Sequence, residues 1–140
     1  MFEVEGLDVE VRVVKGRGIP AGKEEEVVRF DRGDVLEWAC FTFDNADMGV
    51  RFEFEGVGRG NVRRFLTASN LNSYGWTSRN GGISLLKYDA SNNVYVILVE
   101  GDWKFPTGGS LILFNDGSSD GTVTFGLVRF RRENDGRHHD

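Results

Sequence analysis

The sequence predicts an all-β fold: an antiparallel two-sheet β-sandwich, arranged as a jelly roll, with about eight to ten strands. Apolar and polar residues alternate with a period of two along most of the chain, as in strands with one buried face. Turns rich in glycine, asparagine and aspartate separate nearly all of these segments. No window of eleven or more residues shows a convincing helical stripe. The 19 glycines and 11 phenylalanines indicate many turns around an aromatic core.

The expected strands follow one another with short polar connections. In the first, residues 7–13, Leu7, Val9, Val11 and Val13 alternate with charged residues, which predicts a half-buried strand. The other segments of this kind are 26–30, 35–43, 50–55, 62–66, 83–88, 94–99, 110–114 and 122–130. Residues 61–71 could instead form a short helical turn, but a strand leading into a polar loop is favoured.

A single sandwich domain is expected over residues 1–133, followed by a polar tail at 134–140. Two central runs, 94–99 and 125–130, are apolar on both faces near their middles. A strand of this kind is typically covered on both sides. We therefore expect the sandwich to pack against its own long loop or against another subunit.

Composition argues against several classes of function. The net charge of −5 does not favour nucleic-acid binding, and the short apolar runs exclude a membrane span. The one cysteine, Cys40, is expected to be a small core residue. The only histidines, His138 and His139, are adjacent near the end of the chain, so an internal histidine-based catalytic triad is impossible. The protein is expected not to be an enzyme.

Two polar turns could hold calcium, although no cofactor is the favoured expectation. Asp44 and Asp47 lie in DNADMG, and Asp116 and Asp120 lie in NDGSSDGT. Calcium prefers six to eight hard oxygen ligands, which loops of this composition can supply. The same residue types are also those that any tight turn requires, and turn chemistry is the favoured interpretation.

Aromatic residues in polar stretches are the candidate contact residues. Tyr74, Trp76 and Arg79 lie between 70 and 82, and Trp103 and Phe105 lie in EGDWKFPTGG. Exposed aromatic rings beside amides and arginines suit either sugar stacking or a subunit interface. A loop folded back on its own sandwich edge is the third interpretation.

The closing segment SLILFNDGSSDGTVTFGLVRFRRE (110–133) resembles the final hairpin of single jelly-roll structural proteins of viruses, of the capsid, decoration or fibre-head type. The resemblance implies a self-associating subunit, often a trimer, that contacts other virion proteins and has no enzymatic activity. It also implies a location in the virion.

The leading functional hypothesis is therefore a non-enzymatic assembly protein. The alternative is a carbohydrate-binding sandwich module with exposed Trp and Tyr loops and structural calcium. No secretory signal is expected in the N-terminal residues MFEVEGLDVEV, so a non-viral protein would be soluble, either cytoplasmic or released without a signal.

Overall fold

The structure is a computed structural model that describes residues 7–55, 67–75 and 82–133. These residues contain eight strands and one short helix. In chain order they are β1 (Leu7–Ile19), β2 (Glu24–Phe30), β3 (Asp34–Phe43), β4 (Met48–Phe54), α1 (Ala68–Ser73), β5 (Ile83–Asp89), β6 (Val94–Phe105), β7 (Gly109–Asn115) and β8 (Gly121–Glu133).

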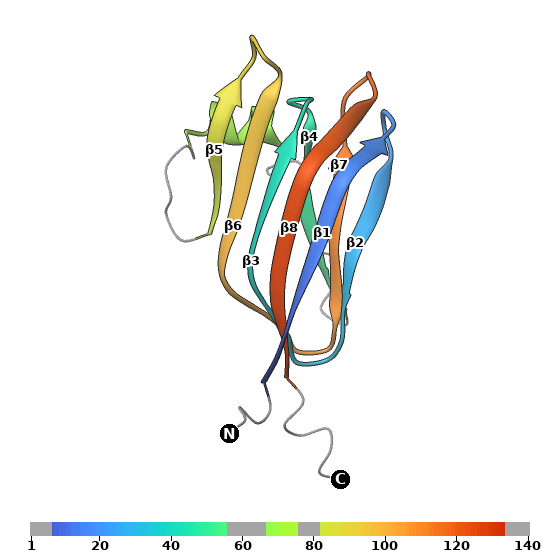
Figure 1. Cartoon of the computed structure of the whole chain (residues 1–140), viewed down its shortest axis with the longest axis vertical. Coiled ribbons are helices and arrows are strands. Elements are labelled where there is room, and N and C mark those ends of the chain that lie inside the picture. The colour runs from blue at the N-terminus through green and yellow to red at the C-terminus, as the bar shows by residue number, and fades with distance from the viewer. Residues whose placement is uncertain (1–6, 56–66, 76–81, 134–140) are drawn as a thin grey trace.

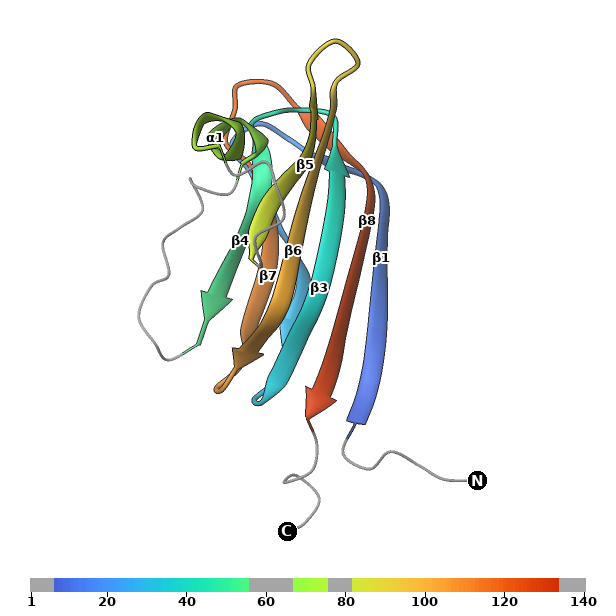
Figure 2. The same ribbon diagram turned by 90° about the vertical axis from the view of Figure 1, so that its left-hand side faces the viewer.

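The strands form two antiparallel sheets packed face to face (Figures 1 and 2). The five-stranded sheet has the order β1-β8-β3-β6-β5, and the three-stranded sheet has the order β2-β7-β4. β1 pairs with β8, β2 with β7 and β3 with β6. This nested pairing is the jelly-roll arrangement, in which one long hairpin is rolled over itself. The predicted antiparallel sandwich is confirmed, and its one irregularity is β5, which joins β6 in the larger sheet.

Aromatic side chains fill the space between the sheets. The rings of Phe30 and Phe105 stack with centroids 4.2 Å apart, and Phe130 meets Phe30 edge-on at 5.3 Å. β7 is buried at every position, since it is the middle strand of the smaller sheet. Each large side chain removed from water in this way stabilises the fold by about 1.5–3 kcal/mol.

The helix α1 corrects the expectation of a polar loop after residue 66. Thr67 caps the helix, because its hydroxyl accepts a hydrogen bond from the Asn70 amide at 3.0 Å. Ala68 and Leu71, one turn apart, are both fully buried. The helix covers one end of the core. It has only six residues, which is too short for a helical pattern to stand out in the sequence. The predicted strand at 62–66 lies outside the described residues, as does the tail 134–140.

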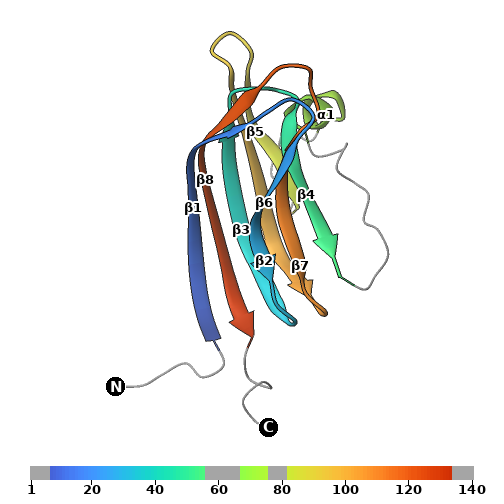
Figure 3. The same ribbon diagram turned by 90° about the vertical axis from the view of Figure 1, so that its right-hand side faces the viewer.

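Two predicted strand ends and one predicted connection also differ. β1 extends to Ile19, beyond the predicted end at 13, and residues 100–105 extend β6 beyond the predicted end at 99. The connection 116–120 is not a hairpin, because it carries the chain from β7 in one sheet to β8 in the other (Figure 3). In a jelly roll the last two strands pair with the first two rather than with each other.

Candidate functional site

The outer face of the five-stranded sheet carries exposed apolar side chains at its β1 edge. Figure 1 looks onto this face. The exposed fractions are 45% for Val9, 54% for Val11, 57% for Val13 and 46% for Phe125. Together with the half-buried Leu127, which pairs with Val13, these residues form what we call the apolar strip.

The strip reverses the orientation predicted for the first strand. The alternation in residues 7–13 predicted that the valines face the core, yet Val9, Val11 and Val13 point to solvent. Val14 is buried instead, and Glu10 and Arg12 share its side of the strand. Because Val13 and Val14 are adjacent, either face of the strand could be the buried one. This ambiguity was the only sign in the sequence that the valines at 9, 11 and 13 face outward.

Apolar character continues across the sheet beyond the strip. Leu127 of β8 pairs with Cys40 of β3, and Cys40 pairs with Leu98 of β6. All three are half-buried. Cys40 therefore lies on the outer face rather than in the core as predicted, and partial burial raises the pKa of its thiol. No described helix or strand covers this face in Figure 1.

Charged residues occupy the neighbouring part of the same face. Glu37 sits at an irregularity in β3 and forms ion pairs with Arg129 and Arg131, each 2.8 Å long. The Arg129 side chain is 48% exposed, whereas Glu37 and Arg131 are partly buried, at 21% and 24% exposed. Their consequence here is a polar border that confines the apolar strip to one part of the sheet.

A second charged cluster holds the inner side of the β1 edge. The Arg132 guanidinium contacts Glu10 at 3.2 Å, Asp31 at 2.9 Å and the fully buried Asp34 at 2.5 Å. Its charged end also lies 4.9 Å from the centre of the Phe130 ring. The hydrogen bond from Arg132 lowers the pKa of Glu10. The Arg132–Glu10 contact anchors β1 to β8, whereas one oxygen of the buried Asp34 carboxylate, Oδ1, has no hydrogen-bond partner among the described residues.

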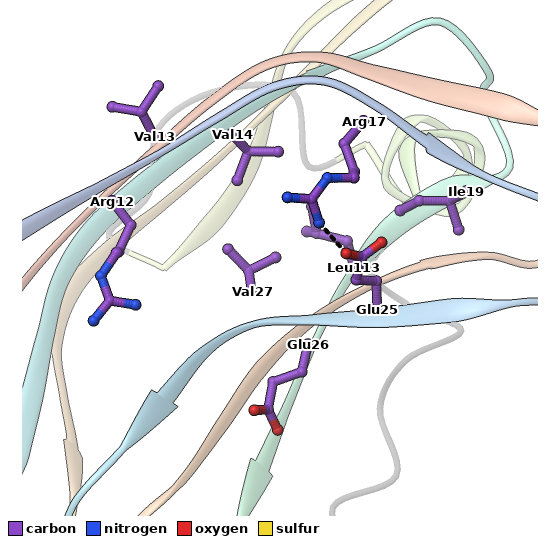
Figure 4. A pocket seen from close by; sticks show the side chains of 9 residues that line it. All are labelled: Arg12, Val13, Val14, Arg17, Ile19, Glu25, Glu26, Val27 and Leu113. Atoms are coloured by element: carbon purple, nitrogen blue, oxygen red, sulfur yellow. Dashed lines mark hydrogen bonds and ion pairs between the residues drawn. The ribbon is translucent and has the colours of Figure 1, made fainter.

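A small pocket lies where β1 and β2 diverge (Figure 4). Its volume is about 130 Å³, and Arg17 and Glu25 form an ion pair inside it. Ligand pockets for drug-sized molecules are typically about 300–1,000 Å³. This pocket is therefore too small for a sugar ring with its contacts, and two of its charges already neutralise each other.

The two predicted calcium turns lie side by side at one end of the sandwich. The Asp116 amide donates to the Asp47 carbonyl at 2.9 Å. The Asp44 carboxylate accepts from the Thr122 amide at 2.7 Å, and the Asp120 carboxylate accepts from the Ala21 amide at 3.0 Å. Two of the four carboxylates thus hold backbone amides. Within the described residues, no cluster of three potential metal-ligating side chains is present.

The described members of the predicted aromatic contact set, Tyr74, Trp103 and Phe105, differ in exposure. Phe105 is fully buried and stacks on Phe54 at 4.7 Å, so it belongs to the core. Trp103 is half-buried, lies 4.9 Å from Phe52 and donates its indole N–H to the Glu100 carbonyl. Tyr74 is 51% exposed at the end of α1. Trp76 and Arg79 lie outside the described residues.

No protein-family model matches the sequence, and no curated protein is significantly similar to it. In the described part of the chain, no helix has the length and apolar character needed to cross a membrane. The apolar strip and the edge beside it are the features that the folded chain leaves unexplained.

Proposed function

We propose that this protein is a non-enzymatic structural subunit that associates with further copies of itself. The observation that supports the proposal is the apolar strip, in which three consecutive outward positions of β1 are valine. Contiguous exposed apolar surface on a folded chain is typical of interaction sites. A strand that only had to cover its own core could carry polar residues at these positions at no cost to folding.

We further propose that the assembly is a virion, with the chain as a capsid, decoration or tail component. The support is the jelly-roll strand order together with the resemblance of residues 110–133 to structural proteins of viruses. Such subunits close into rings or shells through repeated copies of one interface. The expected partners are identical chains, in a trimer or another closed ring, and other virion proteins.

Light scattering over a range of protein concentrations tests the self-association. We expect the mass to rise above that of one chain, and the triple variant V9T/V11T/V13T to shift this rise to higher concentration. Threonine keeps the β-branched shape but adds a hydroxyl to each exposed position. The control is Leu86→Ser, which removes another exposed apolar side chain at the opposite edge of the sheet. A wild-type protein that stays monomeric throughout would refute the proposal.

The carbohydrate-binding alternative has weaker support. Among the described members of the predicted aromatic set, only Tyr74 is well exposed. The experiment for this alternative is a glycan array probed with the wild-type protein and with Tyr74→Ala. Specific binding that this substitution abolishes, in a protein with unchanged melting temperature, would favour the alternative.

A further inference from the structure

β1 differs from the other three edge strands of the sandwich. It has 13 residues, whereas β2, β4 and β5 have seven each. Bulges interrupt the pairing of β2 and β5, and Gly49 of β4 forms a bridge to Thr67. Short length, bulges and coverage are common ways in which proteins protect a sheet edge. β1 lacks all three among the described residues.

The pairing of β1 with β8 is regular along the strand. Partners run without a register shift from Leu7–Glu133 to Lys15–Phe125. In such a ladder, alternate residues direct their N–H and C=O groups toward the neighbouring strand, and the others direct them away. In the described structure β1 pairs with β8 alone, so its second side offers a straight row of backbone donors and acceptors.

We propose that two copies of this chain join through antiparallel pairing of their β1 strands, with Val11 opposite Val11 of the second copy. This inference rests on the self-association proposed above and specifies one contact in it: the contact is two-fold and gives a dimer, so a trimer or larger ring would need a second interface. Val9 then lies opposite the second copy's Val13, which makes the apolar strips of the two chains continuous. On the other side of the strand, Glu10 lies opposite the second copy's Arg12, and the reciprocal pair forms by symmetry.

Charge selects this register over its neighbours. Sliding the strands by two residues in one direction places Glu10 opposite Glu10 of the second copy, and sliding in the other places Arg12 opposite Arg12. Like charges directly opposite each other destabilise a strand pair. A slip by one residue places each valine opposite a charged residue of the second copy. The valines of the two copies then lie on opposite faces of the joined sheet. Only the register centred on Val11 satisfies both the apolar and the charged face.

The side chains that must pair remain accessible at the edge. Glu10 and Arg12 form an ion pair 3.2 Å long within the single chain, and they keep 34% and 43% of their side-chain surface exposed. Arg132 holds Glu10 at 3.2 Å, which fixes the carboxylate near the edge at which the second copy's Arg12 would arrive. The strand pair would therefore share an already oriented carboxylate between Arg12 of its own chain and Arg12 of the second copy.

Charge reversal provides the first test. In Arg12→Glu, positions 10 and 12 are both acidic, and in Glu10→Arg they are both basic. We expect each variant alone to be monomeric at concentrations where the wild-type protein is dimeric, and a one-to-one mixture to form dimers again. Analytical ultracentrifugation measures the masses, and circular dichroism melts verify that each variant is folded.

Cysteine cross-linking provides a second test that leaves the charges intact. In a Cys40→Ala background, Val11→Cys would place two thiols directly opposite each other across the new strand pair. Val9→Cys is the matched control, since the two copies of residue 9 would be offset by about 13 Å along the strands. We expect mild oxidation to give a covalent dimer with Val11→Cys, little with Val9→Cys alone, and a dimer again when Val9→Cys and Val13→Cys chains are mixed.

The outcomes distinguish a failure of the β1 contact from a failure of the proposed self-association. A monomeric wild-type protein would refute both. If the wild-type protein self-associates, but the mixed charge variants stay monomeric and Val11→Cys cross-links no better than Val9→Cys, the β1 contact is wrong while self-association stands. Restored dimers together with selective cross-linking at position 11 support the register.

Discussion

Both faces of the five-stranded sheet carry apolar side chains, but the folding of a single chain explains only those on the inner face. On the inner face, Phe41, Val128 and Phe130 are fully buried. On the outer face, Val11 and Phe125 remain about half exposed although they lie on neighbouring strands of the same sheet. The comparison indicates that inner residues maintain the fold, whereas outer residues are available for contact between molecules.

The sharpest contrast between the faces is expected from removing one phenylalanine from each. Phe41→Ala deletes a fully buried ring, and such deletions cost about 3–5 kcal/mol of unfolding free energy. Phe125→Ala removes an exposed ring and is expected to change that energy by less than about 0.5 kcal/mol. Urea denaturation of both variants measures the difference. Equal losses would show that the outer ring is packed as tightly as the inner one.

Overpacking the inner face is expected to have the next largest effect. A Cβ atom at Gly126 of β8 would lie 2.5 Å from Cδ1 of Phe41, so Gly126→Ala forces the ring to move. We expect a loss of about 1–3 kcal/mol of unfolding free energy. The control is Gly18→Ala in β1, where the nearest atom to a new Cβ is 4.0 Å away.

The same pair of residues offers a stricter check. If the clash is the cause, Phe41→Leu in the Gly126→Ala background should cost less than Phe41→Leu alone. The two substitutions would then be coupled, as expected for side chains in contact. Additive losses would contradict the packing explanation.

The sequence predicted the fold better than the contact surface, and the reason is physical. The alternation in 50–55 and the apolar runs at 94–99 and 110–114 indicated the fold class, because burial of one face of a strand imposes a period of two. The same period cannot tell which face of an edge strand is inward. In β1 the alternating valines were expected to face the core, whereas Val14 and Glu10, which contacts Arg132, occupy that side of the strand.

Two of the candidate contact residues, Trp103 and Phe105, lie in a strand for a related reason. Both were predicted to be exposed contact residues, because they lie in the polar stretch EGDWKFPTGG. The structure places both aromatic residues in β6, where Phe105 packs between Phe30 and Phe54. Tertiary packing overrode the local turn signals, and single-sequence patterns carry no record of such distant partners.

The turns at the end of the sandwich are expected to contribute less than the inner face. Asp44→Ala removes the carboxylate that accepts from the Thr122 amide and leaves this donor without its partner. We expect a loss of about 1–2 kcal/mol, measured as a lower melting temperature. Asp44→Asn, which keeps an acceptor oxygen, should recover part of the loss.

Calcium separates the two interpretations of these turns. If they hold the ion, its addition should raise the melting temperature of the wild-type protein but not of Asp44→Ala. If their carboxylates serve only backbone amides, calcium should change neither melting temperature, and Asp44→Ala should still be destabilised.

The smallest expected effect is the pH dependence contributed by Glu10 at the edge of β1. The hydrogen bond from Arg132 lowers the Glu10 pKa in the folded chain below its ordinary value of 4.5. The unfolded chain therefore binds the proton more readily, so the stabilisation is complete above about pH 4.5 and is lost as pH falls through the lowered pKa. Solvent screening of this partly exposed pair limits the contribution to a few tenths of a kcal/mol, or about 1 kcal/mol at most.

Glu10→Gln isolates that contribution. At concentrations low enough for a single chain, the wild-type protein should be slightly more stable than Glu10→Gln at pH 6, and the difference should shrink toward pH 3. Repeating the melts at high concentration then connects the edge to the assembly. If Glu10 also meets Arg12 of a second copy, the difference at pH 6 should grow with protein concentration, whereas contacts made only within one chain, to Arg132 and Arg12, give the same difference at every concentration.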